Sequence, residues 1–161
     1  MRLKLEPLTR EAFADFGDVI ETEGAHHFPI NQGMAERYHD LAQIDTGTDG
    51  QALLSIFVGR VWPMPIAIRL LERHPLGSQA FIPLQQQDYL VVVAKTPQAS
   101  SLRGFLARGA QGINYRRNVW HHPLLALENE SRFLVIDRGG SGNNLEEASL
   151  SQLVHLDLEL E

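Results

Sequence analysis

The chain has 161 residues, of which 43% are hydrophobic and 21% are charged, and its formal net charge is −6. This length and composition predict one globular domain over residues 1–161 and exclude a disordered or fibrous protein. The negative charge argues against nucleic acid or an anionic membrane as the main partner. Cysteine is absent from the sequence, which excludes disulfides and thiolate metal sites.

The opening residues give a reason to expect a cytoplasmic protein. Residues 1–6 alternate charged and apolar side chains, where a secretory signal would need an apolar core. The sequence also has no apolar run near the roughly 20 residues that a membrane-spanning helix requires. We therefore expect the protein in the cytoplasm.

Short extended segments and one helix are predicted in the first part of the chain. Alternating residues predict a strand at residues 3–5. Thr9 as N-cap, Phe13 and Phe16 three residues apart, and Gly17 as a stop predict one short N-terminal helix. Further extended segments are expected at residues 18–21, 34–42 and 53–58.

The second part of the chain continues the pattern of short strands. Extended segments are expected at residues 66–74, 79–84, 89–94, 102–107, 114–118, 122–127 and 133–138. The continuously apolar run 89–94 is expected to be buried on both faces. Many short strands with evenly spaced turns predict an all-β sandwich or barrel. For the tail from Leu145 we consider a helix packed outside the barrel or against a partner subunit.

The segment 66–74 is the centre of the predicted fold. Because side chains alternate along a strand, Ile66, Ile68, Leu70, Glu72 and His74 would share one face, with Arg69 and Leu71 facing away. If the apolar members of that face point into a core, the carboxylate and the imidazole lie at its mouth. The sequence therefore predicts a polar pocket at one end of the barrel.

A second histidine pair lies about fifty residues further on. His121 and His122 would point to opposite faces of a strand, so at most one enters the pocket, and we expect His121. Together with Glu72 and His74, and with Gln79 as a further oxygen ligand, it would form a set that suits Ni, Mn, Fe or Zn. The commoner explanation of a Glu-x-His pattern is a solvated carboxylate beside a hydrogen-bonded turn histidine.

Arginines near these segments are candidates for holding an anionic substrate. Arg37, Arg73, Arg116, Arg117 and Arg138 all lie beside strand or turn positions that also carry histidine or aspartate. A guanidinium binds a carboxylate through two parallel hydrogen bonds. Most surface arginines form only weak ion pairs, so we expect one or two of the five to be functional.

Four segments together resemble one known family. They are ERYHDL at 36–41, LERHPLGSQAFIP at 71–83, GINYRRNVWHHPL at 112–124 and IDRGG at 136–140, and they are similar to the ureidoglycolate lyase family, formerly known as ureidoglycolate hydrolase. The resemblance implies a cupin-like β-barrel or jelly roll, a homodimer and a place in allantoin degradation. It also implies cleavage of (S)-ureidoglycolate to glyoxylate and urea, with nickel as the associated metal.

The pattern and the resemblance together give an expected site. We expect catalytic roles for Glu72, His74 and His121, which would also bind a metal together with Gln79. The residues expected to bind substrate are Arg37, His39, Arg73, Arg117 and Arg138.

The general cupin motifs match less well. The flanking glycines of the first motif are replaced by Ile66 and Gln86, and in the second motif only His121 remains, with Arg116 and Asn118 at the expected proline and glycine positions. The set of Glu, His, Gln and His is weaker than the usual three-histidine arrangement. We therefore expect a divalent metal such as nickel to bind weakly if it binds at all.

Two other classes of function remain open at this point. One carboxylate and two histidines are also the ligands of non-haem iron oxygenases. Cupin-like barrels also serve as non-catalytic modules that bind a small carboxylate. The candidate site offers an acid, a base and a clamp but no cysteine nucleophile, which favours a lyase.

Overall fold

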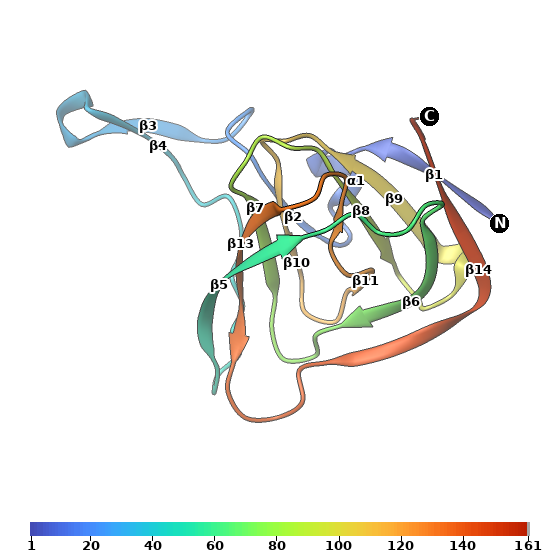
Figure 1. Ribbon diagram of the computed structural model, residues 1–161. Coiled ribbons are helices and arrows are strands. Elements are labelled where there is room, and N and C mark those ends of the chain that lie inside the picture. The colour runs from blue at the N-terminus through green and yellow to red at the C-terminus, as the bar shows by residue number, and fades with distance from the viewer. Residues whose placement is uncertain (161) are drawn as a thin grey trace.

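The computed structural model describes residues 1–160, which form two large β-sheets, a separate two-stranded arm and one short helix (Figure 1). The helix is α1 (Arg10–Phe13). The strands are β1 (Arg2–Pro7), β2 (Gly17–Ile20), β3 (His27–Ile30), β4 (Ala35–Tyr38), β5 (Gln51–Gly59), β6 (Ala67–Arg73), β7 (Gln79–Pro83), β8 (Tyr89–Ala94), β9 (Leu102–Ala107), β10 (Gly112–Tyr115), β11 (Trp120–His121), β12 (Leu125–Ala126), β13 (Ser131–Gly139) and β14 (Glu146–Leu160). Single 3₁₀ turns occur at Asn31–Gly33 and Ala99–Ser101.

The larger sheet closes on itself. Its strand order is β11-β6-β14-β1-β9-β8-β12, and β11 also pairs with β8, so the ring of strands is complete. A first apolar core fills this ring, with side chains from β1, β6, β8, β11 and β14 that include Leu3, Leu5, Ile66, Ile68, Leu71, Val92, Trp120 and Val154. Closure leaves few free strand edges in this part of the molecule.

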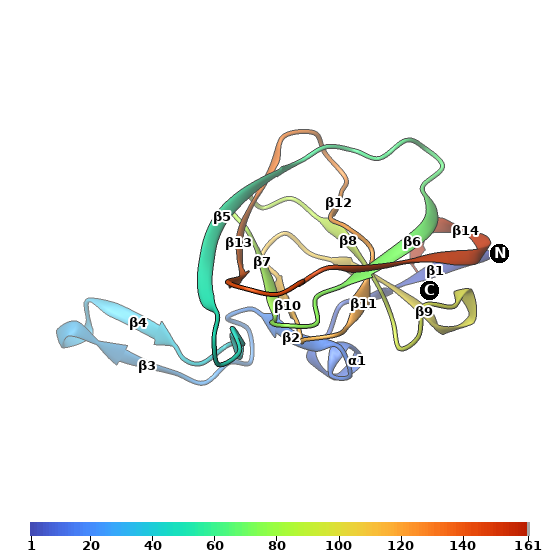
Figure 2. The same ribbon diagram turned by 90° about the horizontal axis from the view of Figure 1, so that it is seen from below.

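The smaller sheet has the order β2-β10-β7-β13-β5 and packs against one face of the closed sheet (Figure 2). Between the two sheets lies a second core, which includes Phe13, Phe16, Phe81, Tyr89, Val91, Phe105, Ile113, Phe133 and Val135. Strand β8 contributes alternate residues to both cores, and all six of its residues are buried. The prediction that the run 89–94 is buried on both faces is therefore confirmed.

The short helix begins where the sequence predicts it. Thr9 has extended backbone angles, and its side chain accepts a hydrogen bond from the backbone N–H of Ala12. Phe13 and Phe16 turn into the second core, which anchors the helix at the end of the barrel. In the described part of the chain, no helix is long and apolar enough to cross a membrane. The expected all-β barrel with one short N-terminal helix is thus confirmed.

The helical tail considered for the residues after Leu145 is wrong. Glu146–Leu160 form β14, which pairs antiparallel with β6 and parallel with β1. Val154 and Leu156 are buried in the first core, while Leu153 is 39% exposed. This alternation has the period of a strand, and burial against β1 and β6 outweighs the modest helix propensity of the segment.

The predicted facing of residues 66–74 is also partly wrong. Ile66 and Ile68 lie in the first core as expected, but the next core residue is Leu71, and Leu70 lies outside that core. The change coincides with an irregularity in the pairing of β6 with β14, where Leu70 pairs with Ser149 but Ile68 pairs with Val154. The break shifts the alternation by one residue, so Glu72 lies on the strand face opposite to Leu71.

We expect substitutions at two adjacent residues of β14 to differ in their effect on stability, because one side chain is buried and the other is exposed. Val154→Ala should lower the free energy of unfolding by about 2 kcal/mol, because it leaves a cavity in the first core. Leu153→Ala, one residue before it on the exposed face, should cost well under about 1 kcal/mol. Urea denaturation of both variants measures the difference. Equal losses would contradict the register of β14.

Candidate functional site

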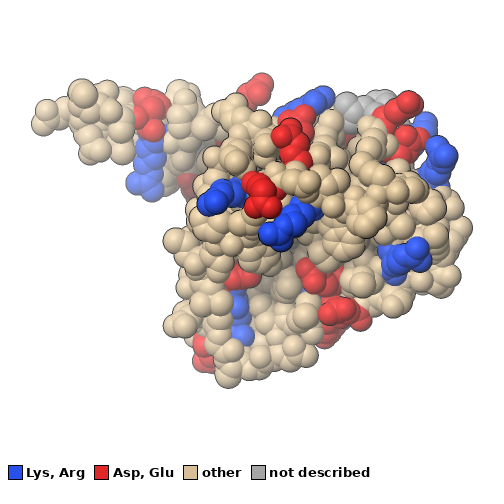
Figure 3. Space-filling model, in the orientation of Figure 1, with Lys and Arg blue, Asp and Glu red and all other residues tan. Residues whose placement is uncertain are grey.

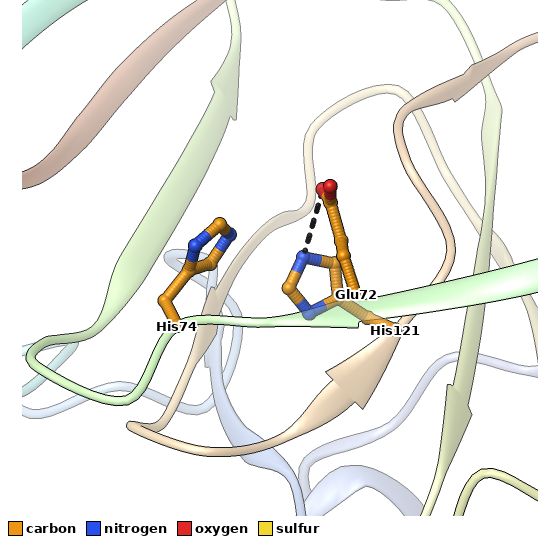
Figure 4. Close-up of side chains that lie close together, drawn as sticks. All are labelled: Glu72, His74 and His121. Atoms are coloured by element: carbon orange, nitrogen blue, oxygen red, sulfur yellow. Dashed lines mark ion pairs between the residues drawn. The ribbon is translucent and has the colours of Figure 1, made fainter. Parts of the chain in front are cut away.

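Glu72, His74 and His121 converge at one end of the closed sheet (Figure 4). Glu72 and His121 are direct partners in the pairing of β6 with β11, and His74 follows just after the end of β6. One ligand atom from each residue lies within 4.8 Å of the others. His121 is buried, whereas Glu72 and His74 are partly exposed. The three residues expected to be catalytic are therefore neighbours.

Backbone carbonyls orient both imidazoles. His74 Nδ1 lies 2.8 Å from the carbonyl oxygen of Asn144, and His121 Nδ1 lies 2.9 Å from that of Val119. A carbonyl only accepts hydrogen bonds, so Nδ1 carries the hydrogen in each ring and the lone pair of a neutral ring is on Nε2. The arrangement is typical of histidines that bind a metal or take up a proton through Nε2.

The ring of His121 is further fixed by stacking on Tyr115. The two ring centroids are 4.1 Å apart and the planes differ by 12°. His121 Nε2 lies 3.5 Å from Glu72 Oε1, and within the described residues it is buried without a hydrogen-bond partner. A buried polar atom without a partner costs about 1–3 kcal/mol, and a proton or cation bound between it and Glu72 would offset that cost.

Gln79 is the fourth member of the cluster. Its Oε1 lies 3.0 Å from His74 Nε2, and its amide Nε2 donates to Asp137 Oδ2 at 3.3 Å, which sets the orientation of the amide. In the neutral ring, His74 Nε2 and Gln79 Oε1 are both acceptors. Their close approach is attractive only when a proton or a cation lies between them.

A divalent metal ion fits these residues. Two imidazoles, one carboxylate and one amide oxygen converge, and the buried Nε2 of His121 lacks another partner. Such mixed nitrogen and oxygen ligands suit Ni, Mn, Fe or Zn. Glu72, His74, Gln79 and His121 would hold the ion.

The electrostatics of the site favour an ionised Glu72. Burial by itself raises the pKa of this carboxyl group, but the interaction with His121 and the charges of His74 and His122 outweigh it, so the pKa is below its ordinary value. For His122, burial is the largest effect and lowers the pKa, only partly offset by its bond to Pro123 and the charge of Glu72. Glu72 is therefore available as a proton acceptor near neutral pH.

His121 and His122 lie in different surroundings, as the alternation along the strand predicts. His122 packs edge-on against Trp62, with ring centroids 4.9 Å apart, and lines a separate apolar pocket that also contains Arg69. His121 alone of the pair joins the cluster among the described residues.

An open pocket of about 420 Å³ leads to Glu72 and Gln79. Its walls come from the end of β5, from the segment after it, from β7 and from residues following β11: Phe57, Val58, Gly59, Arg60, Trp62, Phe81, Pro123 and Leu124. The volume is in the range of small-molecule sites. Arg60 at the rim pairs with Glu130 at 3.4 Å and is largely exposed.

The barrel arginines predicted to bind substrate are engaged elsewhere. Arg73 lies over the ring of Trp120 at 4.5 Å and pairs with Glu146. Arg117 makes two hydrogen bonds to Asp45. Arg138 is buried on the opposite face of β13 from Asp137 and donates to the carbonyl of Ser141. The structure thus shows no contact between these three guanidinium groups and the cluster.

The other two predicted substrate-binding residues are further away. Arg37 lies on β4 and His39 directly follows it, both on the arm that projects from the barrel (Figures 1 and 2). Both side chains are exposed. In a single chain they are separated from the cluster.

Three residues at the site were not predicted from the sequence. Tyr115 stacks on His121, Asp137 accepts from Gln79, and Asn144 holds both His74 and the backbone N–H of Leu76. Alternation along β13 was the available signal for Asp137, since it shares a face with the buried Phe133 and Val135. No local signal identified Tyr115 or Asn144.

Comparison with known proteins identifies the family. The sequence profile described as ureidoglycolate lyase matches residues 1–157. The chain belongs to the ureidoglycolate lyase family. It is 57% identical over 156 residues to a ureidoglycolate lyase of Brucella melitensis, covering 95% of this chain and 92% of the relative. It is 56% identical over 149 residues to one of Stutzerimonas stutzeri, covering 90% and 88% of the two chains.

Similarity to solved structures is much lower than the similarity within the ureidoglycolate lyase family. A mutant of Bacillus subtilis oxalate decarboxylase matches with a TM-score of 0.38 and 12% identity, over 63% of this chain and 24% of that one. The structure of the same enzyme at pH 4.6 matches with a TM-score of 0.37 and 10% identity, over 66% and 29%.

We expect Ni²⁺ or Mn²⁺ to bind at the cluster without being needed for folding. In calorimetric titration, His74→Ala and His121→Ala should each weaken binding by at least about 10-fold, because each removes a ligand. His122→Ala is the matched control and should bind as the wild type does. Circular dichroism in EDTA should show the intact fold. Loss of the fold on chelation, or equal affinity in all variants, would contradict this prediction.

Proposed function

We propose that this protein is a ureidoglycolate lyase, which cleaves (S)-ureidoglycolate to glyoxylate and urea in the breakdown of allantoin. The membership of residues 1–157 in the ureidoglycolate lyase family carries the proposal. The convergence of Glu72, His74 and His121 at an open pocket supplies groups that suit this reaction.

The reaction is an elimination at a single carbon. That carbon of ureidoglycolate carries a hydroxyl group, a carboxylate and a ureido nitrogen. A base removes the hydroxyl proton, the oxygen electrons form the new C=O bond, and the C–N bonding electrons leave with the nitrogen. An acid then delivers a proton to that nitrogen, so glyoxylate and urea are the two products.

Glu72 is the base in this proposal. Its carboxyl group is ionised, because its pKa is below the ordinary value, and it lies at the inner end of the pocket. His74 is the acid in this proposal, because its ring is partly exposed and its Nε2 faces Gln79 Oε1 at 3.0 Å, which favours a proton on that atom. His121 is held by Tyr115 and Val119, and it orients Glu72.

We further propose nickel as the ion that Glu72, His74, Gln79 and His121 hold in an alternative state of the site, in which the metal-bound Glu72 and His74 no longer act as base and acid. When bound, it would supply a Lewis acid for the hydroxyl and carboxylate oxygens of the substrate. The two carbonyl-bound imidazoles and the unpartnered Nε2 of His121 support this choice of ligands.

We also propose a one-domain protein over residues 1–161 that works as a homodimer in the cytoplasm. The family resemblance in the sequence supports this part of the proposal, and an exposed apolar strand, described below, supports the dimer.

The first test measures products. Incubation with (S)-ureidoglycolate should release glyoxylate and urea in equal amounts, because one C–N bond breaks for each molecule consumed. Urea, ammonia, glyoxylate and oxygen consumption are assayed together. Ammonia in place of urea would indicate an amide hydrolase, and iron-dependent oxygen uptake an oxygenase. Saturable glyoxylate binding without turnover would indicate a binding module. Any of the three would contradict the proposal.

Substitutions within the cluster test the assignment of residues. His74→Ala should reduce kcat by on the order of 100-fold, because an acid–base group is lost. His121→Ala should also reduce it strongly, since Glu72 loses its partner. Steady-state rates are compared with melting temperatures to separate chemistry from folding.

Two neighbouring residues provide controls. Arg69 occupies an exposed position of β6, and His122 lines the other pocket, so the control variants are Arg69→Ala and His122→Ala. Both should keep turnover close to that of the wild type per folded molecule. The residue assignment is wrong if these two lose turnover while His74→Ala and His121→Ala retain it.

A further inference from the structure

The β3–β4 arm stands clear of the barrel (Figure 3). Within the described residues it forms a two-stranded sheet of its own, with four residue pairs from His27–Tyr38 to Ile30–Ala35. An isolated hairpin of this size is marginally stable in water. Its regular pairing therefore indicates that another surface supports it.

The arm presents apolar and cationic side chains on one face. Phe28 is opposite Arg37 in the pairing, so both point to the same side, together with Ile30 and His39. The ring of His39 contacts that of Phe28 at a centroid distance of 5.6 Å. Met34, at the tip, is 86% exposed. This is a surface of the kind that packs against an apolar partner.

Strand β5 is a complementary apolar surface. It is the edge strand of the smaller sheet, and Gln51 to Val58 are exposed on both faces. Leu54 is 71% exposed and Ile56 is 51% exposed on the outer face. A long, flat, apolar edge strand readily pairs with or packs against another chain. An exposed strand of this composition is rare in a monomer.

The same strand borders the functional pocket. Phe57 and Val58 line the pocket that contains Glu72 and Gln79. Phe57 pairs with the buried Phe133, so its side chain points to the inner face of the sheet, where it is still 38% exposed. Whatever covers β5 therefore also lies at the mouth of the pocket.

The position of the arm excludes packing against its own β5. It projects outward on the side of the molecule where β5 lies (Figures 1 and 2). A two-fold axis on this side would bring each arm to the β5 of the other copy, as the reciprocal contacts of an isologous dimer require.

The exposed area fits this arrangement. The accessible surface is 8932 Å², whereas about 8,100 Å² is expected for a folded monomer of 18.1 kDa. A surface above the average for this mass is what an arm that stands clear of the barrel and an uncovered edge strand produce.

Charge also favours a second copy. Glu72 lines the pocket, Asp137 binds its neighbour Gln79, and the substrate would add a further carboxylate, yet Arg73, Arg117 and Arg138 are engaged elsewhere. Arg37 is an exposed guanidinium on the apolar face of the arm. Delivered to the mouth of the pocket, it would add a second guanidinium to Arg60, which lies at the rim and pairs with Glu130.

We propose that the arm of one copy packs on β5 of a second copy and brings Arg37 to the mouth of that copy's pocket. There Arg37 binds the carboxylate of the substrate, a role that rests on the proposed lyase function. Each site of the dimer is then completed by the other chain.

Cross-linking tests the packing independently of activity. The chain has no cysteine, so Met34→Cys in one tagged chain and Leu54→Cys in a second tagged chain create a single pair of thiols across the interface. A short bis-maleimide should join the two chains, and sedimentation should show a dimer. Met34→Cys with Leu158→Cys, which lies at the far end of β14, should not cross-link. A monomer, or a dimer without the 34–54 cross-link, would overturn the proposal.

Mixed dimers test the role of Arg37. Arg37→Ala should lower kcat/KM by on the order of 10- to 100-fold, mainly through KM, because a charge-assisted contact is lost. Glu36→Gln, which lies on the other face of the arm, is the control and should be neutral. Dimers of one Arg37→Ala chain and one His74→Ala chain, purified through two tags, contain one intact site. They should recover about half of the wild-type turnover.

The outcomes separate the two proposals. Mixed dimers without turnover would show that Arg37 acts within its own chain, and full activity of Arg37→Ala would show that it does not bind substrate; either overturns the proposal for Arg37. If the wild type does not turn over ureidoglycolate but cross-links at 34–54, the lyase function fails and the packing stands. If turnover is normal and the cross-link is absent, the packing of the arm on β5 fails and the lyase function stands.

Discussion

The two residues of β11 connect the parts of this molecule. Trp120 and His121 pair with β8, and His121 also pairs with Glu72 of β6. This double pairing closes the larger sheet, and alternation turns Trp120 into the first core and His121 toward the space between the sheets. One short bridge thus completes a hydrophobic core and places an imidazole against a carboxylate. Without it, β6 and β8 would separate, and the site would be lost with the closed sheet.

The site contains a buried polar atom that lowers the stability of the folded chain. The Nε2 atom of His121 is buried with no hydrogen-bond partner in the described chain, although Tyr115 and Val119 hold the rest of the ring. His74 is held in a comparable way between Asn144 and Gln79. Rings that are fixed on one side and open on the other are prepared for a proton or a cation. This preparation explains why the cluster lies at the end of a rigid strand and not on a mobile loop.

The argument that brought Glu72, His74 and His121 together in the sequence was only partly correct. Glu72, His74 and His121 do converge, but Leu71 and not Leu70 continues the core face of β6. The pairing of β6 with β14 contains an irregularity that has no signal in residues 66–74, because it depends on a segment some eighty residues away. The positions of Arg138 and Asp137 depend on a similar point. Arginine was expected for its charge, but the face of β13 that looks toward the site carries the aspartate.

The sequence by itself determined the features that depend on neighbouring residues. These are the Thr9 cap, the burial of the run 89–94 on both faces, the extended character of most of the barrel strands before residue 140, and the opposite orientations of His121 and His122. The tertiary structure decided which distant groups meet: Tyr115 and Asn144 beside the histidines, the tail as a strand, and the barrel arginines in ion pairs away from the pocket. It also decided that β5, apolar enough for a core, is an exposed edge. These outcomes depend on pairing between remote segments, and local periodicity carries no information about which strand becomes the neighbour.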